Sequence, residues 1–580
     1  MRVLGIEGTA WCASAALYDA ETDSVLIESN PYEPDSGGIH PREAAEHMSE
    51  AIPEVVDAVL TAAEEDHGPD AIDAVAFSRG PGLGPCLRTV ATAARSLAGA
   101  LDVPLVGVNH MVAHLEIGRH RSGFENPVCL NASGANAHLL GYHDGRYRVL
   151  GETMDAGVGN AIDKFTRHVG WDHPGGPKVE AAARRYAAGS DGPGDLLDLP
   201  YVVKGMDFSF SGISSAANDA SDDGVPVEEI CFSLQEHVFA MLTEVSERAL
   251  SLTGADELVL GGGVAQNDRL REMLASMCAA RGAEFHAPEP RFLRDNAGMI
   301  AVLGAKMTAA GDTLSIPESA IDPNFRPDQV PVTWRSDGSV ARGRAPGASD
   351  GTDADRRGAE ATVEIVAVGE GGDGSGGGDR SGAAADRRVI KRRVRKAYRH
   401  PELDRALRRD RTVAEARLTS EARRAGVPTP LVYDVDVPEA TLTLQHVGDR
   451  DLAAALDGGT ERAASVGRHL ARLHDAGIVH GDPTTRNVRV GSGGSDGRST
   501  VATDGPTDDD RTSLIDFGLA YHTGHVEDHA MDLHVFEGSV RATASDPDPL
   551  IEAFEAGYAA VGDDDVLARL RDVEGRGRYR

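Results

Sequence analysis

The chain has 580 residues, of which 41% are hydrophobic and 26% charged, and a formal net charge of −34. This length excludes a single domain, because hydrophobic cores stop growing at roughly 250–300 residues, and no segment approaches the roughly 20 apolar residues that a membrane span needs. Met1 runs directly into the apolar segment Val3–Ile6 without a basic flank or a cleavage site, so we expect a soluble, cytoplasmic protein with no membrane association.

The charge has an unusual distribution. Acidic residues are spread through the chain, and almost all basic residues are Arg rather than Lys. We interpret this pattern as adaptation to a salty cytoplasm, where carboxylates keep the surface hydrated and salt screens their repulsion; an acidic partner-binding tail would gather the charge in one block. The five cysteines are scattered and form no C-x-x-C motif, which argues against a disulfide framework and a thiolate metal site.

The first half alternates short apolar runs typical of strands with longer runs of helical periodicity. This alternation, with glycine turns after several strands, predicts an α/β fold. The predicted strands are Val3–Ile6, Val75–Phe77, Leu105–Val108, Val128–Leu130 and Leu258–Leu260, and the predicted helices are Glu43–Ala63, Thr89–Ala100, Val227–Thr253 and Asp268–Arg281.

Two histidines, His110 and His114, follow the third predicted strand at a spacing of i and i+4. In a helix this spacing places both imidazoles on one face, where they can share a metal ion; a solvated helix face would give the same pair by chance. Asp295, before a helix of small residues, can supply a third ligand. Two His and one carboxylate leave open positions, as in a catalytic Fe²⁺, Zn²⁺ or Mn²⁺ site.

Three glycine-rich turns accompany these residues, at Ser133–Asn136, Gly157–Asp163 and Gly261–Asn267. Each offers backbone N–H groups at a helix start or after a strand, which suits phosphate or a nucleotide. A role in turning and packing is the alternative for each turn alone. Together they predict a nucleotide-binding cleft between two domains.

Composition changes sharply after Phe325. The stretch Arg326–Gly358 is rich in Pro, Gly, Asp and Arg and has no sustained apolar periodicity, which indicates a linker. Gly369–Arg388 and Gly491–Arg511 have a similar composition and are predicted to be long hairpin insertions. We therefore divide the chain into residues 1–325, a linker over 326–354, and residues 355–580.

The second half reads as two strands, a helix (Asp410–Ala425), a strand pair and then mostly helix, which is the element order of a protein kinase. Its kinase elements are the strand lysine Lys391, a helix Glu415 as ion-pair partner, and a catalytic loop with Asp482 as proton acceptor. Asn487 and Asp516 complete the set as Mg²⁺ ligands. One such element is common by chance; all of them in kinase order are not.

The first half resembles the archaeal catalytic subunit of KEOPS, the tRNA N6-threonylcarbamoyladenosine synthase family, over nearly all of residues 1–325. This resemblance implies an actin/sugar-kinase/Hsp70-like fold of two subdomains. The motifs that carry it are Gly5–Thr9, Gly38–Ala45, Pro81–Leu83, the His110/His114 helix, Ala161–Phe165, Gly175–Pro177, Asp207–Gly212 and Gly261–Asn267.

The resemblance implies transfer of a threonylcarbamoyl group from threonylcarbamoyl-AMP to N6 of the adenosine 3′ of the anticodon in tRNA. It also implies one divalent metal, Fe²⁺ favoured and Zn²⁺ as the alternative, on His110, His114 and Asp295. Many relatives have a metal-ligating Tyr at the position of Asn131, so an amide oxygen or a water takes that place here. The implied substrate contacts are Asn131, Ala132, Ser133, Gly134, Ala135, Asp163, Gly176, Glu180 and Asn267.

The second half resembles the small KEOPS kinase over about residues 355–580. The resemblance implies a small bilobal kinase-like domain that uses Mg²⁺ and ATP and regulates or resets the transferase. The glycine-rich loop is replaced by Gly358, Ala359, Glu360 and Ala361, an A-P-E motif is missing, and Gly481 stands where ordinary kinases have Arg. A pseudokinase is the alternative. Partners implied are a small dimerising subunit and a subunit that contacts the kinase.

Three other functions are weighed against this interpretation. A metalloprotease would need a general-base Glu where Met111 stands, a sugar kinase would need a sugar-binding motif that the chain lacks, and a binding-only platform for tRNA would need neither His110 nor Asp482.

Two basic stretches, Arg387–Arg411 and the tail Arg576–Arg580, stand out against the acidic background. Both are candidates for tRNA contact. A salt-bridge network on the lobe surface is the alternative for the first.

Overall fold

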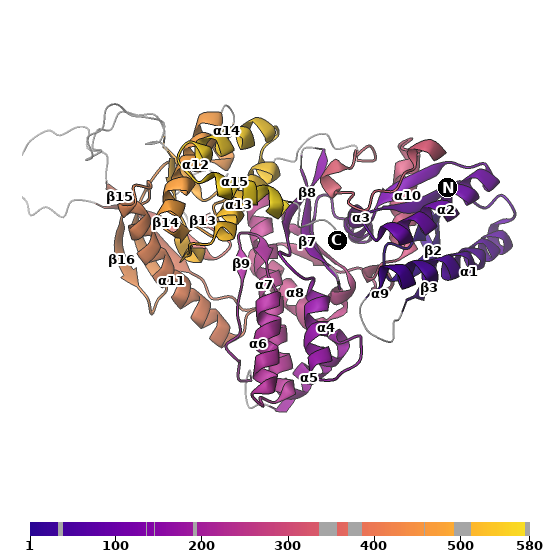
Figure 1. The fold of residues 1–580 in the computed structure, drawn as a ribbon, viewed down its shortest axis with the longest axis horizontal. Coiled ribbons are helices and arrows are strands. Elements are labelled where there is room, and N and C mark those ends of the chain that lie inside the picture. Colours follow the sequence, from indigo (N-terminus) through magenta and orange to yellow (C-terminus); the bar gives the residue numbers. More distant parts are fainter. Residues whose placement is uncertain are drawn as a thin grey trace, which may run out of the picture.

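The computed structural model describes residues 1–580 apart from 33–38, 135, 144, 190–193, 336–355, 369–385, 457–458, 492–511 and 575–580. Figure 1 shows three bodies: an indigo first sheet with its helices, a magenta second sheet with its helices in the middle, and an orange and yellow C-terminal part. Within the described residues, every helix is too short or too polar to cross a membrane.

The first body is a five-stranded mixed sheet in the order β3-β2-β1-β4-β5. The strands β1, β2 and β3 form an antiparallel meander, and β4 and β5 add parallel to β1. Helices α1 and α2 pack on one face and α10 on the other. The bounds are β1 Arg2–Glu7, β2 Cys12–Asp19, β3 Ser24–Pro31, α1 Pro41–His67, β4 Ala74–Gly80, α2 Gly84–Leu101, β5 Leu105–Asn109 and α10 Ala297–Ala309.

The second body repeats this topology. Its sheet order is β8-β7-β6-β11-β12, with β6, β7 and β8 antiparallel and β11 and β12 parallel to β6. Two copies of one strand order confirm the predicted actin-like fold of two subdomains. The bounds are β6 Val128–Ala132, β7 Ala137–His143, β8 Arg146–Glu152, α4 Val158–His168, α5 Gly176–Gly189, β9 Val203–Lys204, β10 Asp207–Phe208, α6 Ser211–Asp222, α7 Val227–Thr253, β11 Glu257–Gly261, α8 Asp268–Arg281, β12 Glu284–His286 and α9 Pro290–Leu293.

Helix α3, His110–Ser122, lies between the two subdomains. It contacts α10 and β5 of the first subdomain and β6 and β11 of the second. Close packing is possible because α3 has a glycine where it meets β11: a Cβ atom on Gly118 would stand 3.1 Å from Val259. The two predicted metal-binding histidines therefore lie at the junction of the subdomains.

The third body has the two lobes of a kinase. Its sheet has the antiparallel order β13-β14-β15-β17-β16, with α11 packed against it, and helices α12–α15 make most of the other lobe. The bounds are β13 Arg356–Arg357, β14 Ala361–Val368, β15 Asp386–Arg393, α11 Pro401–Arg424, β16 Val432–Asp436, β17 Thr441–Gln445, β18 Arg450–Asp451, α12 Thr460–Asp475, β19 Ile478–Val479, β20 Val488–Val490, β21 Thr512–Leu514, β22 Tyr521–His522, α13 Val526–Thr543, α14 Asp548–Ala559 and α15 Asp564–Glu574.

The beginning of the stretch predicted as a linker packs on the first half. Arg335 is buried, its guanidinium lies 3.7 Å from the Tyr142 ring, and its Nη2 donates to the Glu125 carbonyl at 2.7 Å. Residues 336–354 of the predicted linker lie outside the described residues, as do most of the two predicted insertions and the basic tail. Strand β15 begins at Asp386, inside the first of those predicted insertions.

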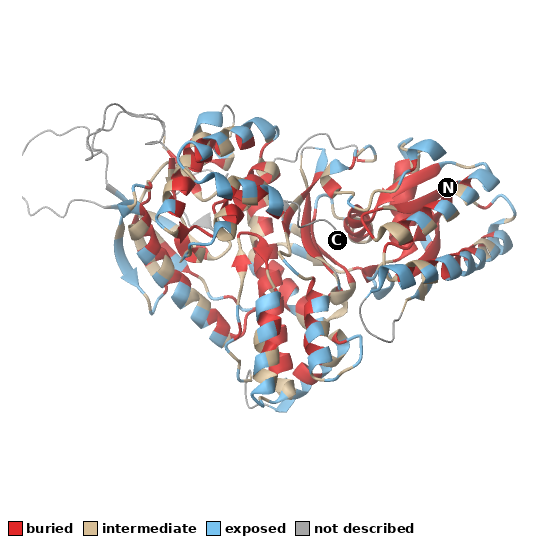
Figure 2. Cartoon of the chain, viewed as in Figure 1, coloured by how far each residue is buried: buried red, intermediate tan, exposed pale blue. Residues whose placement is uncertain are grey.

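Helix α7 joins the second subdomain to the kinase. Figure 2 shows it buried along much of its length. Its Glu244 accepts hydrogen bonds from Arg399 at 2.7 Å and from Arg411 at 3.1 Å, and Glu247 accepts one from Lys396 at 2.5 Å. These three cations of the basic stretch Arg387–Arg411 therefore form ion pairs with the first half of the chain, as in the predicted salt-bridge alternative, but in a buried interface and not on a lobe surface.

Candidate functional site

The structure brings His110, His114 and Asp295 together. His110 opens α3, where the Asn109 side chain accepts a hydrogen bond from the Val112 amide at 3.0 Å and caps the helix. Asp295 lies between α9 and α10, and its Oδ1 is 3.3 Å from His110 Nε2 and 3.2 Å from His114 Nε2. One ligand atom from each residue lies within 4.8 Å of the others, the spacing of ligands around one ion.

Glu7 adds a second buried carboxylate to this cluster. Its Oε2 is 3.1 Å from His110 Nδ1, and its side chain is fully buried. Burial by itself lowers the pKa of His110, but the charges of Glu7 and Asp295 outweigh burial and raise that pKa to about 10. Two buried carboxylates thus require positive charge between them, which a proton on His110 or a divalent cation supplies.

Two orphaned atoms test whether the residues fit a metal. His114 Nδ1 and Asn131 Oδ1 are buried and have no hydrogen-bond partner among the described residues, although buried polar atoms are rarely left unpaired. A Cβ on Gly261 would stand 3.5 Å from Asn131 Oδ1 and 3.9 Å from His114 Nδ1, so both atoms face the same space. An imidazole that binds metal through Nε2 carries its proton on Nδ1 and needs an acceptor nearby. The residues therefore fit a metal.

His138 lies behind Asn131 on the neighbouring strand. The two residues pair directly across β6 and β7, and Asn131 Nδ2 is 3.5 Å from His138 Nε2. Burial, followed by the nearby charges of His114 and His110, lowers the pKa of His138 to about 3. His138 is therefore a neutral imidazole that holds the Asn131 amide. Sequence reasoning missed both Glu7 and His138; only the Gly5–Thr9 motif pointed towards the former.

The glycine-rich turns meet beside this cluster. A Cβ on Gly262, which has a φ of 86°, would stand 2.2 Å from the Ala132 carbonyl oxygen, so the third turn touches the end of β6. The Gly134 carbonyl accepts from the Asn160 amide at 2.8 Å, which ties the first turn to the second. These contacts join the three turns to one another at the end of β6, and the third turn reaches His114 of the cluster through Gly261.

The other predicted substrate contacts lie further along the second subdomain, and each already has a protein partner. Asp163 accepts from the Gly175 amide at 2.8 Å, just before Gly176, which opens α5 and has open space beside it. Glu180 accepts from the Asp268 amide at 3.1 Å, and the Asn267 side chain caps α8. Ala135 lies outside the described residues.

The predicted kinase residues also converge. Lys391 Nζ is 2.7 Å from Glu415 Oε1 and 2.8 Å from Asp516 Oδ1, and Asn487 Nδ2 donates to Asp482 Oδ2 at 3.0 Å. Asp532, which sequence reasoning missed, fixes the catalytic loop because its carboxylate accepts from the His480 amide at 2.7 Å and from the Gly481 amide at 2.8 Å.

The turn Gly358–Glu360 joins β13 to β14, at the place of the glycine-rich loop in a kinase sheet. The Glu360 carboxylate pairs with Arg393 at 2.8 Å, with Arg248 at 3.3 Å and with Arg411. Because Arg248 also contacts Asp482 and Arg393 also contacts Glu415, Glu360 belongs to the same network of charges as the predicted kinase residues.

A residue of the first half contacts the predicted kinase residues. Arg248 of α7 donates to Asp482 Oδ2 at 2.9 Å. Burial raises the pKa of Asp482 to about 7, while the charge of Arg248 works against that rise. The kinase carboxylate is therefore held by an arginine from the other half of the chain.

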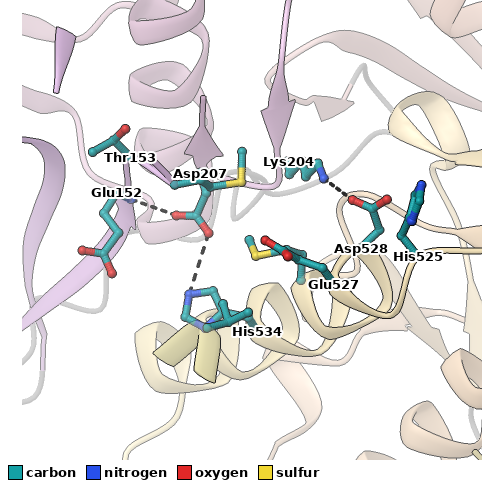
Figure 3. Close-up of a pocket in the computed structure, with 11 residues that line it drawn as sticks. Glu152, Thr153, Lys204, Asp207, His525, Glu527, Asp528 and His534 are labelled. Atoms are coloured by element: carbon teal, nitrogen blue, oxygen red, sulfur yellow. Dashed lines mark hydrogen bonds and ion pairs between the residues drawn. The ribbon is translucent and has the colours of Figure 1, made fainter. Parts of the chain in front are cut away.

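A cavity of about 330 Å³ lies at the same interface, between the end of β8, the β9–β10 hairpin and α13 (Figure 3). Asp207 Oδ1 accepts from the Glu152 amide at 2.8 Å, and its Oδ2 is 3.8 Å from His534 Nε2. Burial raises the pKa of Asp207 to about 7. The Asp207–Gly212 motif therefore begins at the contact between the two halves.

Comparisons with known proteins cover the whole chain. Residues 22–302 match the family described as TsaD, tRNA N6-adenosine threonylcarbamoyltransferase. A "Probable bifunctional tRNA threonylcarbamoyladenosine biosynthesis protein" of Halobacterium salinarum is 67% identical over 100% of this chain and 99% of the relative, and one of Methanospirillum hungatei is 48% identical over 100% and 99%. The crystal structure of T. kodakarensis HypF aligns at a TM-score of 0.40 and 12% identity, covering 55% of this chain and 49% of that one.

Proposed function

Because the chain belongs to the family of bifunctional tRNA threonylcarbamoyladenosine biosynthesis proteins, we propose that its first half transfers a threonylcarbamoyl group from threonylcarbamoyl-AMP to tRNA. The acceptor is N6 of the adenosine 3′ of the anticodon (position 37), in tRNAs that read codons beginning with A. The observation that carries this proposal is the convergence of His110, His114 and Asp295 between two actin-like subdomains, beside the glycine-rich turn at Gly261.

His110, His114 and Asp295 would hold the divalent metal, with Fe²⁺ favoured. When bound, such a metal supplies Lewis-acid polarisation of a carbonyl and orientation of the reactants. Glu7 keeps His110 in place through Nδ1, and Asn131 Oδ1, which has no partner among the described residues, is the proposed acceptor for the His114 Nδ1 proton. The burial of these groups excludes water, which protects a reactive mixed anhydride from hydrolysis.

The turns and the second subdomain bind the adenylate in this proposal. The backbone of residues 131–135 and the turn at Gly261 contact the phosphate and the threonylcarbamoyl group. Asp163 and Glu180 accept the ribose hydroxyls, Gly176 lies under the sugar or base, and Asn267 contacts the nucleoside. Asp163 also pairs with His173 at 3.1 Å, and Glu180 also accepts from Arg184 at 3.1 Å, but each carboxylate has about four lone pairs and so keeps some for these hydroxyls.

The second half is, in the same proposal, a Mg²⁺- and ATP-dependent Ser/Thr kinase or ATPase that regulates the transferase. Lys391 forms ion pairs with the α- and β-phosphates of ATP, and Glu415 orients the lysine side chain, as in protein kinases. Asn487 and Asp516 hold Mg²⁺, and Asp482 accepts the proton of the attacking hydroxyl. The turn Gly358–Ala361 covers the phosphates through its backbone. We further propose that the chain works within KEOPS, with a small dimerising subunit and a subunit that binds the kinase.

The structure does not support a protease function. Met111, which stands where a zinc protease has its water-activating Glu, is buried in the apolar core between the subdomains. A general base at this position is therefore missing, and the geometry favours no second function for the metal cluster.

The proposal is tested by transfer of radiolabelled threonylcarbamate from threonine, bicarbonate and ATP onto unmodified tRNA in molar KCl. The reaction contains an adenylate-forming enzyme and the other complex subunits. We expect label on the anticodon-loop adenosine with wild type and with the control His67→Ala, an exposed histidine at the end of α1. His110→Ala should leave tRNA unlabelled; equal labelling by His110→Ala and wild type contradicts the proposal.

A further inference from the structure

An aromatic residue and an arginine meet at the edge of the metal cluster. Trp11 lies in the turn between β1 and β2, four residues after Glu7, which bonds to His110. Arg294 directly precedes Asp295, and its guanidinium carbon is 5.7 Å from the centroid of the Trp11 ring. Trp11 and Arg294, here called the Trp–Arg pair, therefore border the cluster from two different segments of the chain.

The pair also reaches the second subdomain. A Cβ on Gly263, in the third glycine-rich turn, would stand 3.9 Å from Arg294 Cγ. The stem of Arg294 thus lies between the turn of the first subdomain and the glycine turn of the second. Any substrate that reaches the metal cluster along this edge has to pass the pair.

The charge of Arg294 has no partner among the residues that the structure describes. Its side chain is exposed and makes neither a hydrogen bond nor an ion pair with any residue that the structure describes. Its neighbours behave differently: Arg291 donates to the Val25 carbonyl at 3.0 Å, and Arg269 donates to Glu236 at 2.7 Å. In a chain of net charge −34, an uncompensated cation beside the site is well placed for a polyanion.

The chemistry of the pair suits a single-stranded nucleotide. RNA loops are recognised by stacking of unpaired bases on aromatic rings and on guanidinium planes, combined with contacts from arginine to phosphate. Trp11 is half-buried, so the turn fixes it while part of its surface stays accessible. If the pair only stabilised the turn, a buried arginine would stabilise it more than an exposed one.

We propose that the Trp–Arg pair binds the anticodon loop of the tRNA. Trp11 stacks on an unpaired base of the loop, and Arg294 pairs with an adjacent backbone phosphate. This inference rests on the proposed function of the same site and adds a contact on the RNA side of the reaction. The predicted adenylate contacts come from the second subdomain, whereas Trp11 comes from the first, across the cluster.

The test measures binding of a synthetic, unmodified anticodon stem-loop to the full chain at several KCl concentrations. Trp11→Ala and Arg294→Gln should each weaken binding at least about fivefold, since one stacked base contributes ~1–3 kcal/mol. Trp11→Phe keeps an aromatic face and should retain most of the affinity. Arg294→Gln should also reduce the slope of log affinity against log salt by about 0.7, the value for one lost single-strand phosphate contact.

Arg424→Gln is the matched control, because it removes an equally exposed arginine at the end of α11 in the kinase half. Titration with AMP and measurement of bound metal separate the RNA contact from the rest of the site. The pair is not an RNA contact if Trp11→Ala and Arg294→Gln leave stem-loop affinity unchanged, or if AMP affinity falls as much as stem-loop affinity. A wild type that binds the stem-loop but transfers no label would refute the proposed function and leave this inference standing.

Discussion

At the residue scale, both candidate sites place partly or fully buried carboxylates next to cations. In the transferase half Glu7 and Asp295 surround His110, and in the kinase half Asp482 and Asp516 face Arg248 and Lys391. Buried carboxylates of this kind are stable only with a cation close by. The two regions therefore invite tests in which one charge is removed and the partner is left in place.

Glu7→Gln tests the role of the second carboxylate at the metal cluster. Residues that orient a metal ligand through hydrogen bonds typically affect metal affinity about 10–100-fold, so we expect the dissociation constant for Fe²⁺ or Zn²⁺ to rise by that factor. Competition with a chelator measures it. Glu46→Gln, an exposed glutamate on α1, is the control, and metal affinity equal to wild type in Glu7→Gln speaks against the assignment.

Asp482 gives a pH dependence whose sign follows from its role as a base. Its pKa is raised to about 7, and only the deprotonated carboxylate accepts a proton, so kcat/KM for ATP hydrolysis should rise with pH and level off above about pH 7. Arg248 holds this pKa down, so Arg248→Gln should move the midpoint to higher pH. A midpoint that stays at the wild-type pH would show that Arg248 does not act on Asp482.

At the element scale, α7 makes the main ion pairs between the two halves of the chain. Its polar residues Glu236, Glu244 and Glu247 point to cations that follow 33 to 167 positions later in the chain. The helix is buried along both its apolar and its charged positions. An amphipathic helix packed on one sheet would keep a polar face in water, so α7 is the core of an interface.

Glu244→Ala tests this interface. The change leaves Arg399 and Arg411 with one fewer buried acceptor, and removing one partner of a buried ion pair costs about 3–5 kcal/mol. We expect a lower unfolding temperature by calorimetry in molar KCl. Glu228→Ala, at the half-buried first turn of the same helix, should unfold near the wild-type temperature. Equal unfolding temperatures for the two variants would exclude a stabilising role for Glu244.

The sequence predicted the elements unevenly. The apolar runs at Val3–Ile6, Val75–Phe77 and Leu105–Val108 are β1, β4 and β5, and the long periodic segments are α1 and α7. Strand β2, Cys12–Asp19, escaped prediction because it is buried on both faces and consists largely of Ala and Ser, which carry little strand signal. Strands β3, β7 and β8 were missed as well.

The candidate sites were predicted where the signal is local. The spacing of His110 and His114 is visible in the sequence, and so is the order of Lys391, Asp482 and Asp516. Contacts between Glu7 and His110 or between Arg248 and Asp482 join residues 103 and 234 positions apart, and only the folded chain brings them together.

At the scale of the whole molecule, the net charge of −34 favours a protein that needs salt. Exposed carboxylates repel one another over distances that salt screens, whereas the buried pairs at α7 are screened much less. We expect the unfolding temperature to rise from low to molar KCl. An uncharged solute at equal osmolality is the control, and an unfolding temperature that is flat or falls with KCl contradicts the interpretation of the charge.

The central claim is that one chain carries a transferase in its first half and a regulatory kinase or ATPase in its second. The most direct measurement is mass spectrometry of tRNA nucleosides after single-turnover and multiple-turnover reactions with wild type, His110→Ala and Asp482→Asn. We expect Asp482→Asn to form the modified adenosine in the first turnover and to fail in later ones, and His110→Ala to form none. Modification by His110→Ala, or loss of the first turnover in Asp482→Asn, would contradict this division of labour.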